Sequence, residues 1–261
     1  MYDFSVKDKI KENLSLYRKI VPYHHFLKCE IPNLIKFHAV NPTEFVVNKD
    51  KKLIYIVMPK VACSSITSAL TGQSDVKDNY SIHESVSKLK NISVLDDVNS
   101  YFKFTVVRNP IERILSCYLS KYHGDKKYLD ILRFDRYLLG YLRKDNGFKE
   151  FVRKIFHIPD WASDQHFKSQ YSIIYEKGKS FADHIGRYED DSLGIGEILR
   201  NYNLDDIPHL NRNNSFELYN YYDIETLDLL YRRYFLDFKY FNYELVYEKF
   251  RNDLKDRVNC S

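Results

Sequence analysis

The chain has 261 residues, which is enough for one large α/β domain or two small ones. Its hydrophobic fraction of 44% and charged fraction of 29% are ordinary for a soluble globular protein, and a formal charge of +4 does not by itself indicate nucleic-acid binding. The N-terminal residues are too polar for a signal peptide, and no stretch approaches the roughly 20 apolar residues that span a bilayer. We therefore expect a soluble, cytoplasmic protein with no transmembrane segment and no nucleic-acid partner.

The four cysteines, at positions 29, 63, 117 and 260, include no CxxC pair. This spacing is typical neither of a zinc site nor of a disulfide framework, so reduced thiols in the cytosol are expected. The adjacent His24 and His25 lie in a predicted loop without a further cluster of ligands. The sequence therefore predicts no metal site.

The first part of the chain is predicted to be helical and then irregular. Residues 5–20 place apolar side chains at helical spacing, and Pro22 ends this helix. Three prolines interrupt residues 22–43, which we expect to be irregular. A short strand is predicted at 45–47.

Residues 53–72 are predicted to form a strand, a short loop and a helix. The run from 53 to 58 is entirely apolar, which is typical of a fully buried strand, and a proline ends it. Ser64 or Ser65 is predicted to cap the helix that follows, and Gly72 to end it.

The loop of this unit has the features of an anion site. Backbone N–H groups and the positive dipole end at a helix start attract anions, and Lys60, Ser64 and Ser65 add a full charge and two hydroxyl donors. The glycines of GxxxxGK[ST] are missing, which disfavours an ATP- or GTP-hydrolysing P-loop enzyme. Since many such turns bind nothing, this loop alone leaves a phosphate or sulfate site and a purely structural turn both open.

A second strand and helix follow a polar stretch. A loop is predicted at 73–81, a short helix at 84–90 and a buried strand at 103–107. Arg108 directly follows that strand, and Pro110 suits the first turn of the helix beyond it.

Arg108 is a second candidate for anion binding. Ligands of open α/β sheets bind outside the carboxyl ends of the strands, so Arg108 and Lys60 meet at one sheet edge if their strands are neighbours. Two basic side chains there favour a ligand with two separated anionic groups. Ser116 lies about two helical turns beyond Arg108, and Arg113 is expected to form a surface ion pair.

The rest of the chain alternates helices with loops around one strand. Helices are predicted at 128–158, 192–201, 223–242 and 243–257, the strand at 184–188, and loops at 162–180 and 203–214. With no internal repeat and no convincing linker, we predict one domain over residues 1–261.

Two stretches of the sequence, 59–66 (PKVACSSI) and 107–118 (VRNPIERILSCY), resemble segments of one known family. This family is the PAPS-dependent carbohydrate sulfotransferases of the membrane-type and bacterial branch, which includes the heparan 2-O- and chondroitin 4-O-type enzymes. PAPS is 3′-phosphoadenosine 5′-phosphosulfate. The first stretch resembles the family's 5′-phosphosulfate loop, and the second resembles its 3′-phosphate segment VRxPxERxxSxY. Weaker similarities lie at 164–170, 184–190 and 222–242, so the resemblance covers 53–243. Residues 1–45 match nothing and are expected to form an N-terminal helical extension.

The resemblance implies a fold and a donor site. The implied fold is α/β, a P-loop-like three-layer sandwich with a central, mostly parallel sheet flanked by helices. The implied cofactor is PAPS, with 3′-phosphoadenosine 5′-phosphate as product. The residues implied in its binding are Lys60, Val61, Ala62, Cys63, Ser64, Ser65, Ile66, Arg108, Ser116, Tyr188 and Arg212.

The resemblance also assigns roles within this set. Lys60 is expected at the bridging and sulfuryl oxygens, with the loop around the 5′-phosphate. Arg108 and Ser116 are expected to hold the 3′-phosphate, with Arg212 as a further phosphate contact. Tyr188 either lies against the adenine or packs in the core.

Sulfuryl transfer to a hydroxyl also needs a general base. His83 is the first candidate, because it follows the central helix in a Tyr-x-x-His setting similar to that of heparan-type 2-O-sulfotransferases, and a histidine titrates near neutral pH. Glu84 is its rival and His166 the third candidate or an acceptor contact. A surface histidine that caps a short helix is the alternative interpretation of His83.

The leading hypothesis is therefore a sulfotransferase, bacterial in origin, that moves the sulfuryl group of PAPS to a saccharide or glycoconjugate hydroxyl by in-line displacement, without a metal. A small-molecule kinase and a non-catalytic nucleotide-binding module of P-loop-like fold are the alternatives. The sequence leaves the acceptor, the sulfated position and the oligomeric state open.

Overall fold

The computed structural model describes residues 26–72, 88–122, 137–143, 145–204, 207 and 218–259. The predicted helix at 5–20 lies outside these residues. The chain divides into two compact units, one formed by Met1–Asn41 with Cys117–Ser163 and the other by Pro42–Ser116 with Asp164–Ser261. The single domain predicted over 1–261 stays a prediction.

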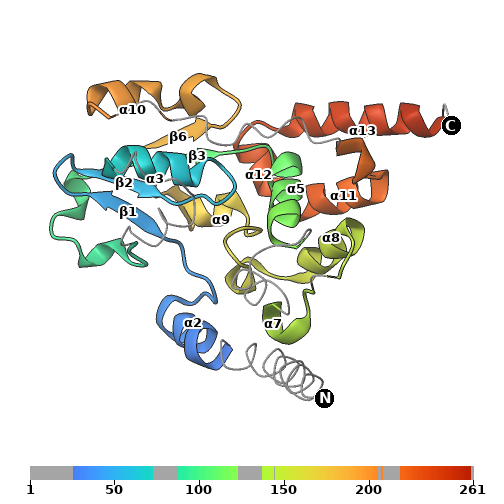
Figure 1. The fold of residues 1–261 in the computed structure, drawn as a ribbon, viewed down its shortest axis with the longest axis horizontal. Helices are drawn as coiled ribbons and strands as arrows, with labels where there is room; N and C mark the ends of the chain where they lie inside the picture. Colours follow the sequence, from blue (N-terminus) through green and yellow to red (C-terminus); the bar gives the residue numbers. More distant parts are fainter. Residues whose placement is uncertain are drawn as a thin grey trace, which may run out of the picture. The chain divides into compact units, whose positions relative to one another are not determined.

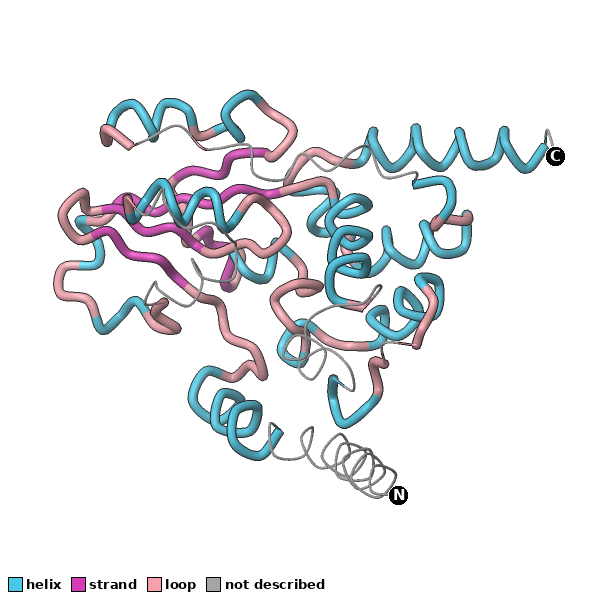
Figure 2. The backbone as a smooth tube through the Cα atoms, in the orientation of Figure 1, coloured by secondary structure: helices cyan, strands magenta, loops and turns pink. Residues whose placement is uncertain are grey.

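The second unit is built on a mixed sheet in which three parallel strands carry an antiparallel edge strand, flanked by helices (Figures 1 and 2). Its strands, in spatial order, are β1 (Phe45–Asn48), β2 (Leu53–Ile56), β3 (Phe102–Val107) and β6 (His184–Arg187). The strands predicted at these places are confirmed. The three-layer, P-loop-like arrangement stays a prediction.

The centre of the sheet is apolar and fully enclosed, as the continuous apolar runs of β2 and β3 predict. Every residue of β2 has an exposed fraction of 0%. Tyr55 pairs with Phe104 across the strands, with ring centroids 5.5 Å apart. Thr105 is the polar exception, and its hydroxyl donates to the Ile56 carbonyl at 2.9 Å.

Helix α3 (Cys63–Thr71) follows β2 and packs against β1. The Asn48 carboxamide donates to the Leu70 carbonyl at 2.7 Å, which ties the helix end to the sheet. Gly72 ends the helix with a φ of 66°, as predicted. The predicted serine cap is wrong: the residue before the helix is Ala62 with a φ of 50°. Because that left-handed residue turns the chain early, both serines already lie within the first helical turn.

Helix α5 (Pro110–Lys121) follows β3 and begins at its proline, as predicted. Two short 3₁₀ segments, Ile92–Val94 and Val98–Ser100, precede β3. The helix predicted at 84–90 is wrong in its described part, since Leu89 forms an isolated antiparallel bridge with Phe45.

The C-terminal part of this unit is mainly helical. Its elements are α9 (Gln170–Ile174), β4 (Tyr175–Glu176), β5 (Lys179–Ser180), η5 (Asp191–Gly194), α10 (Gly196–Asn201), η6 (Leu218–Asn220), α11 (Ile224–Arg233), α12 (Phe235–Tyr240) and α13 (Glu244–Asn259). The loop predicted at 162–180 is therefore wrong at α9 and at the β4–β5 hairpin. The helix predicted at 223–242 is divided at Tyr234, and α12 packs against α9.

The first unit contains η1 (Phe26–Glu30), α2 (Ile31–Phe37), α7 (Tyr137–Gly140), α8 (Phe148–His157) and η4 (Asp160–Ala162). The irregular stretch predicted at 22–43 is wrong at α2, because Pro32 lies in the first turn, where a missing N–H costs nothing. Helix α8 confirms part of the prediction at 128–158 and buries Phe148, Phe151 and Ile155. In the described ranges of both units, every helix is too short or too polar to cross a membrane.

Candidate active site

The two predicted phosphate segments meet at one edge of the sheet. Because β2 and β3 are parallel neighbours, the loop after β2 and the turn after β3 emerge side by side. The Arg108 guanidinium reaches across and donates through Nη1 to the Lys60 carbonyl at 3.4 Å. The structure therefore brings Lys60 and Arg108 together from positions 48 apart in the chain.

The loop between β2 and α3 has an unusual backbone. Lys60 and Ala62 have φ angles of 71° and 50°, in the left-handed region that side chains with a Cβ disfavour. Such conformations cost about 1–3 kcal/mol each and gather at functional sites. Val61 and Ile66 turn their side chains into the core, with exposed fractions of 0% and 1%. The loop therefore presents mainly its backbone and the Lys60 side chain.

The start of α3 is left without a side-chain cap among the described residues. The first N–H groups of a helix have no carbonyl partner within it. Ile66 donates its backbone N–H to the Ala62 carbonyl at 3.0 Å. The first turn of the helix also holds Ser64 and Ser65, which are 8% and 3% exposed.

Arg108 is buried, with an exposed fraction of 9%. Its Nη2 donates to a Glu112 carboxylate oxygen at 2.7 Å, and its guanidinium carbon lies 4.4 Å from the centre of the Tyr188 ring. The Nε atom is buried and has no hydrogen-bond partner among the described residues. A buried N–H without an acceptor is costly, so this atom fits a site for an anionic ligand.

The backbone of Arg108 is held by Gln170. The Arg108 N–H donates to the Gln170 side-chain oxygen at 2.9 Å, and the Gln170 amide nitrogen donates to the Arg108 carbonyl at 2.8 Å. The next residue, Asn109, donates its backbone N–H to Glu189 at 2.8 Å, and Glu189 also accepts from the Tyr243 hydroxyl at 2.7 Å. The turn that carries Arg108 is therefore anchored by two side chains from distant elements.

Asp237 on α12 anchors the start of α9. Its carboxylate accepts from the Ser169 hydroxyl at 2.6 Å and from the backbone N–H groups of Gln170 and Tyr171 at 2.9 and 2.8 Å. Burial raises the pKa of Asp237 above its usual value, although these hydrogen bonds act to lower that pKa. Asp237 is not among the site residues predicted from the sequence, although it lies within the weak similarity at 222–242.

The surface ion pair predicted for Arg113 is wrong. Its exposed fraction is 1%, and the guanidinium donates to three backbone carbonyls. Nε reaches Pro59 at 3.3 Å, Nη1 reaches Lys168 at 2.8 Å and Nη2 reaches Gln165 at 2.9 Å. Arg113 faces inward because the rigid fork of a guanidinium satisfies carbonyls that would otherwise be buried without donors.

His166 and Asp164 form a pair in the segment before α9. The His166 Nδ1 lies 2.6 Å from a carboxylate oxygen of Asp164, which also accepts the His166 backbone N–H at 2.9 Å. A carboxylate at Nδ1 orients the imidazole and selects its tautomer. This arrangement suits the base or acceptor contact predicted for His166, which stays a prediction.

The other predicted residues are placed in part. Ser116 is half-buried on α5, one turn beyond Glu112, and Tyr188 is half-buried beside Arg108. His83, Glu84 and Arg212 lie outside the described residues. In the described part of the chain, no three His, Cys, Asp or Glu side chains are grouped so that they could hold a metal ion.

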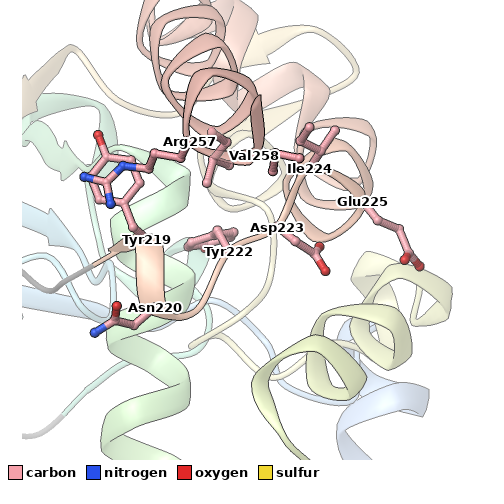
Figure 3. Close-up of a pocket in the computed structure, with 9 residues that line it drawn as sticks. Tyr219, Asn220, Tyr222, Asp223, Ile224, Glu225, Arg257 and Val258 are labelled. Atoms are coloured by element: carbon pink, nitrogen blue, oxygen red, sulfur yellow. The ribbon is translucent and has the colours of Figure 1, made fainter. Parts of the chain in front are cut away.

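A pocket of about 560 Å³ lies in the C-terminal part of the same unit (Figure 3). The residues that line it are Tyr219, Asn220, Tyr222, Asp223, Ile224, Glu225, Leu254, Arg257 and Val258. Figure 3 shows Arg257 against the Tyr219 ring, whose centroid is 3.6 Å from the guanidinium carbon. None of the predicted site residues that the structure describes lines this pocket.

Comparison with known proteins supports the resemblance of the stretches 59–66 and 107–118 to sulfotransferases. The chain matches the model of the sulfotransferase family over residues 43–244. It is 28% identical to carbohydrate sulfotransferase 14 of Danio rerio over 55% of this chain and 44% of the relative. It is 26% identical to carbohydrate sulfotransferase 11 of Rattus norvegicus over 77% of this chain and 67% of the relative.

The chain thus spans less than half the length of the first of these relatives. No solved structure matches it significantly. Because the family match covers most of the chain and includes both segments at the sheet edge, the chain belongs to the sulfotransferase family.

Proposed function

We propose that this protein is a PAPS-dependent sulfotransferase that sulfates a hydroxyl of a saccharide or glycoconjugate. The observation that carries the proposal is the meeting of the Lys60 loop with Arg108 at one sheet edge, in a chain of this family. Two basic groups at adjacent strand ends suit a nucleotide with phosphate groups at both its 5′ and 3′ positions. The family match favours this activity over the kinase alternative.

Several features of the edge fit the donor. The buried Nε of Arg108 has no acceptor among the described residues, which supports a role in holding the 3′-phosphate with Ser116. The uncapped start of α3 supports a 5′-phosphate site around 61–66. Tyr188 is proposed beside the adenine, and Arg212 as a further phosphate contact.

Lys60 is the proposed electrostatic catalyst. PAPS supplies the sulfuryl group and a 5′-phosphate leaving group. In the proposed in-line displacement, an acceptor oxygen bonds to sulfur as the bond from sulfur to the 5′-phosphate oxygen breaks. Lys60 would stabilise the negative charge that develops on that oxygen, which is commonly the largest contribution of an enzyme to such a reaction.

The acceptor hydroxyl must also lose its proton. We propose His83 as the general base, with Glu84 as the rival candidate. His166 is the third candidate, and its pairing with Asp164 supports a role that needs an oriented imidazole. The printed names of the relatives, which are carbohydrate sulfotransferases, support a saccharide acceptor.

The direct test is calorimetric titration of 3′-phosphoadenosine 5′-phosphate into the purified protein without metal, with ADP as the comparison ligand. We expect tight binding of the 3′,5′-bisphosphate and weak binding of ADP, and a loss of this preference in Arg108→Ala. Arg143→Ala is the matched control, because Arg143 pairs with the exposed Asp145. Equal affinity for both nucleotides, or turnover of ATP with magnesium and not of PAPS, would contradict the proposal.

A saccharide screen with PAPS follows if the nucleotide binds. Sulfate transfer to a sugar hydroxyl is the expected result, and transfer confined to non-carbohydrate alcohols would contradict the acceptor class. The cytoplasmic location expected from the sequence stays a prediction that cell fractionation can test.

A further inference from the structure

One short segment of the chain contacts the proposed 3′-phosphate segment directly and is linked to the Lys60 loop through Arg113. We call residues 164–171 the bridging segment. Its backbone carbonyls at Gln165 and Lys168 bind the Arg113 guanidinium, and the side chain of Gln170 binds the backbone of Arg108. The first set comes from Gln165 and Lys168 and the second from Gln170, and the two sets reach different arginines of the stretch 107–118.

The first set ends at the loop that carries Lys60. Arg113 uses its third nitrogen, Nε, to donate to the carbonyl of Pro59, the residue directly before Lys60. A single buried guanidinium therefore fixes the start of this loop against the bridging segment. Lys60 itself has a left-handed φ of 71°, so its backbone depends on neighbouring contacts to hold it.

The second set ends at Arg108. The carboxamide of Gln170 makes two hydrogen bonds, as acceptor from the Arg108 N–H and as donor to the Arg108 carbonyl. Gln170 has an exposed fraction of 0%, so neither bond competes with water. This pairing fixes the backbone from which the Arg108 side chain extends.

The bridging segment is itself fixed from the C-terminal helices. Asp237 accepts hydrogen bonds from Ser169, Gln170 and Tyr171, and the Tyr234 hydroxyl donates to the Phe167 carbonyl. The segment that contacts Arg113 and Arg108 is therefore itself held by four hydrogen bonds. A segment held in this way can position each of the two arginines.

We infer that Arg113 and Gln170 are positioning residues with separate tasks. Arg113 sets the Lys60 loop at the sulfuryl end of the donor, and Gln170 sets Arg108 at the 3′-phosphate end. This inference rests on the proposed function, because it assumes that PAPS occupies the edge. It adds that the two ends of the donor are positioned by different side chains: Arg113 of α5, which is bound to the bridging segment, and Gln170 of the segment itself.

The test uses two ratios of dissociation constants, measured by titration on the whole protein. The ratio for 5′-AMP over 3′-phosphoadenosine 5′-phosphate reports the 3′-phosphate contact. The ratio for 3′-phosphoadenosine 5′-phosphate over PAPS reports the sulfuryl contact. A general loss of folding changes all affinities together and leaves both ratios unchanged.

Gln170→Met removes both hydrogen bonds at similar volume, and Arg113→Lys keeps the charge but loses the fork. We expect Gln170→Met to lower the first ratio about tenfold and to leave the second unchanged. The reason is that a displaced Arg108 loses its contact with the 3′-phosphate, and a hydrogen bond to a charged group is worth about that factor or more. Arg113→Lys should lower the second ratio by a similar factor and leave the first unchanged. Arg143→Lys, at an exposed arginine, should change neither ratio.

Equal changes of both ratios in both variants, or no change in either, would overturn the inference. If a variant fails to fold, the same two ratios are measured on Gln170→Glu and Arg113→Gln, which keep part of the hydrogen bonding. Failure of the proposed function is distinguishable, because the wild-type protein would then show no preference for the 3′-phosphorylated nucleotide.

Discussion

The Arg108 guanidinium lies over the face of the Tyr188 ring, 4.4 Å from its centre, and one nitrogen pairs with Glu112. The ring and the carboxylate together hold a buried cation at the end of β3. A guanidinium over an aromatic face gains about 0.5–2 kcal/mol, depending on its solvation. Tyr188 therefore supports Arg108, which belongs to the proposed donor site, independently of the adenine contact proposed for this tyrosine.

Replacing Tyr188 should weaken nucleotide binding by a moderate amount. Tyr188→Leu removes the aromatic face, and we expect the affinity for 3′-phosphoadenosine 5′-phosphate to fall by about 1 kcal/mol, or about fivefold. Tyr188→Phe keeps the face and is the matched control. Calorimetric titration measures both; a loss in Tyr188→Phe as large as that in Tyr188→Leu would assign the effect to the hydroxyl instead.

Replacing Lys60 should abolish most turnover while the protein stays folded. The Lys60 side chain is the proposed partner of the departing phosphate, and losing one such electrostatic contact typically costs about 10²-fold or more in rate. We expect Lys60→Ala to lose at least this factor in kcat with PAPS and a saccharide acceptor. Activity within about threefold of wild type would refute the role of Lys60.

Replacing His83 separates the candidate bases. If His83 takes the acceptor proton, His83→Ala should bind 3′-phosphoadenosine 5′-phosphate normally and lose about 10²–10⁴-fold in kcat. Glu84→Gln and His166→Ala are measured in parallel under the same conditions. Retained turnover in His83→Ala, with a collapse in one of the others, would move the base to that residue.

Replacing Asp237 should destabilise the fold. The Asp237 carboxylate accepts hydrogen bonds from three donors. In Asp237→Asn an amide N–H₂ replaces one carboxylate oxygen and cannot accept a hydrogen bond. We therefore expect a loss of about 1–3 kcal/mol in the free energy of unfolding. Urea denaturation measures this loss. A variant as stable as wild type would show that the three hydrogen bonds contribute nothing net.

The pH dependence of Asp237 has a defined sign. Burial raises the native pKa above the unfolded value, so the native state binds this proton more tightly. The stability gained from this tighter proton binding is therefore fully present below the unfolded pKa of about 3.9 and is lost as the pH rises through the native pKa. Between these two pKa values, the free energy of unfolding of wild type should fall relative to that of Asp237→Asn as the pH rises. An increase would contradict the direction of the shift.

Replacing Gly186 tests the packing of β6 against the turn at 193–194. A Cβ at Gly186 would lie 2.3 Å from the Leu193 carbonyl oxygen, so the backbone must move to accept it. We expect Gly186→Ala to cost about 1–3 kcal/mol of stability, as overpacking usually does. Gly147→Ala, where a Cβ meets nothing within 4 Å, is the control in the same denaturation assay.

The local patterns of the sequence determined the core elements and the positions of the two proposed donor-binding segments. An apolar run ended by a proline predicts β2 and its loop, because burial on both faces of a central strand needs continuous apolar residues. The strand before Arg108 and the helix from Pro110 follow from equally local signals. The same local logic failed at Pro32, which lies in the first turn of α2, and at Ser64, because a left-handed Ala62 starts α3 earlier.

The tertiary structure alone decided which side chains hold the site together. Arg113 meets carbonyls 52 to 55 positions away, and Gln170 and Asp237 act across 62 and 67 positions. Nothing in the helical pattern of α5 distinguishes an arginine that is solvated from one that enters the core. A buried charge is tolerated only where acceptors surround it, and those acceptors come together only when the distant segments fold.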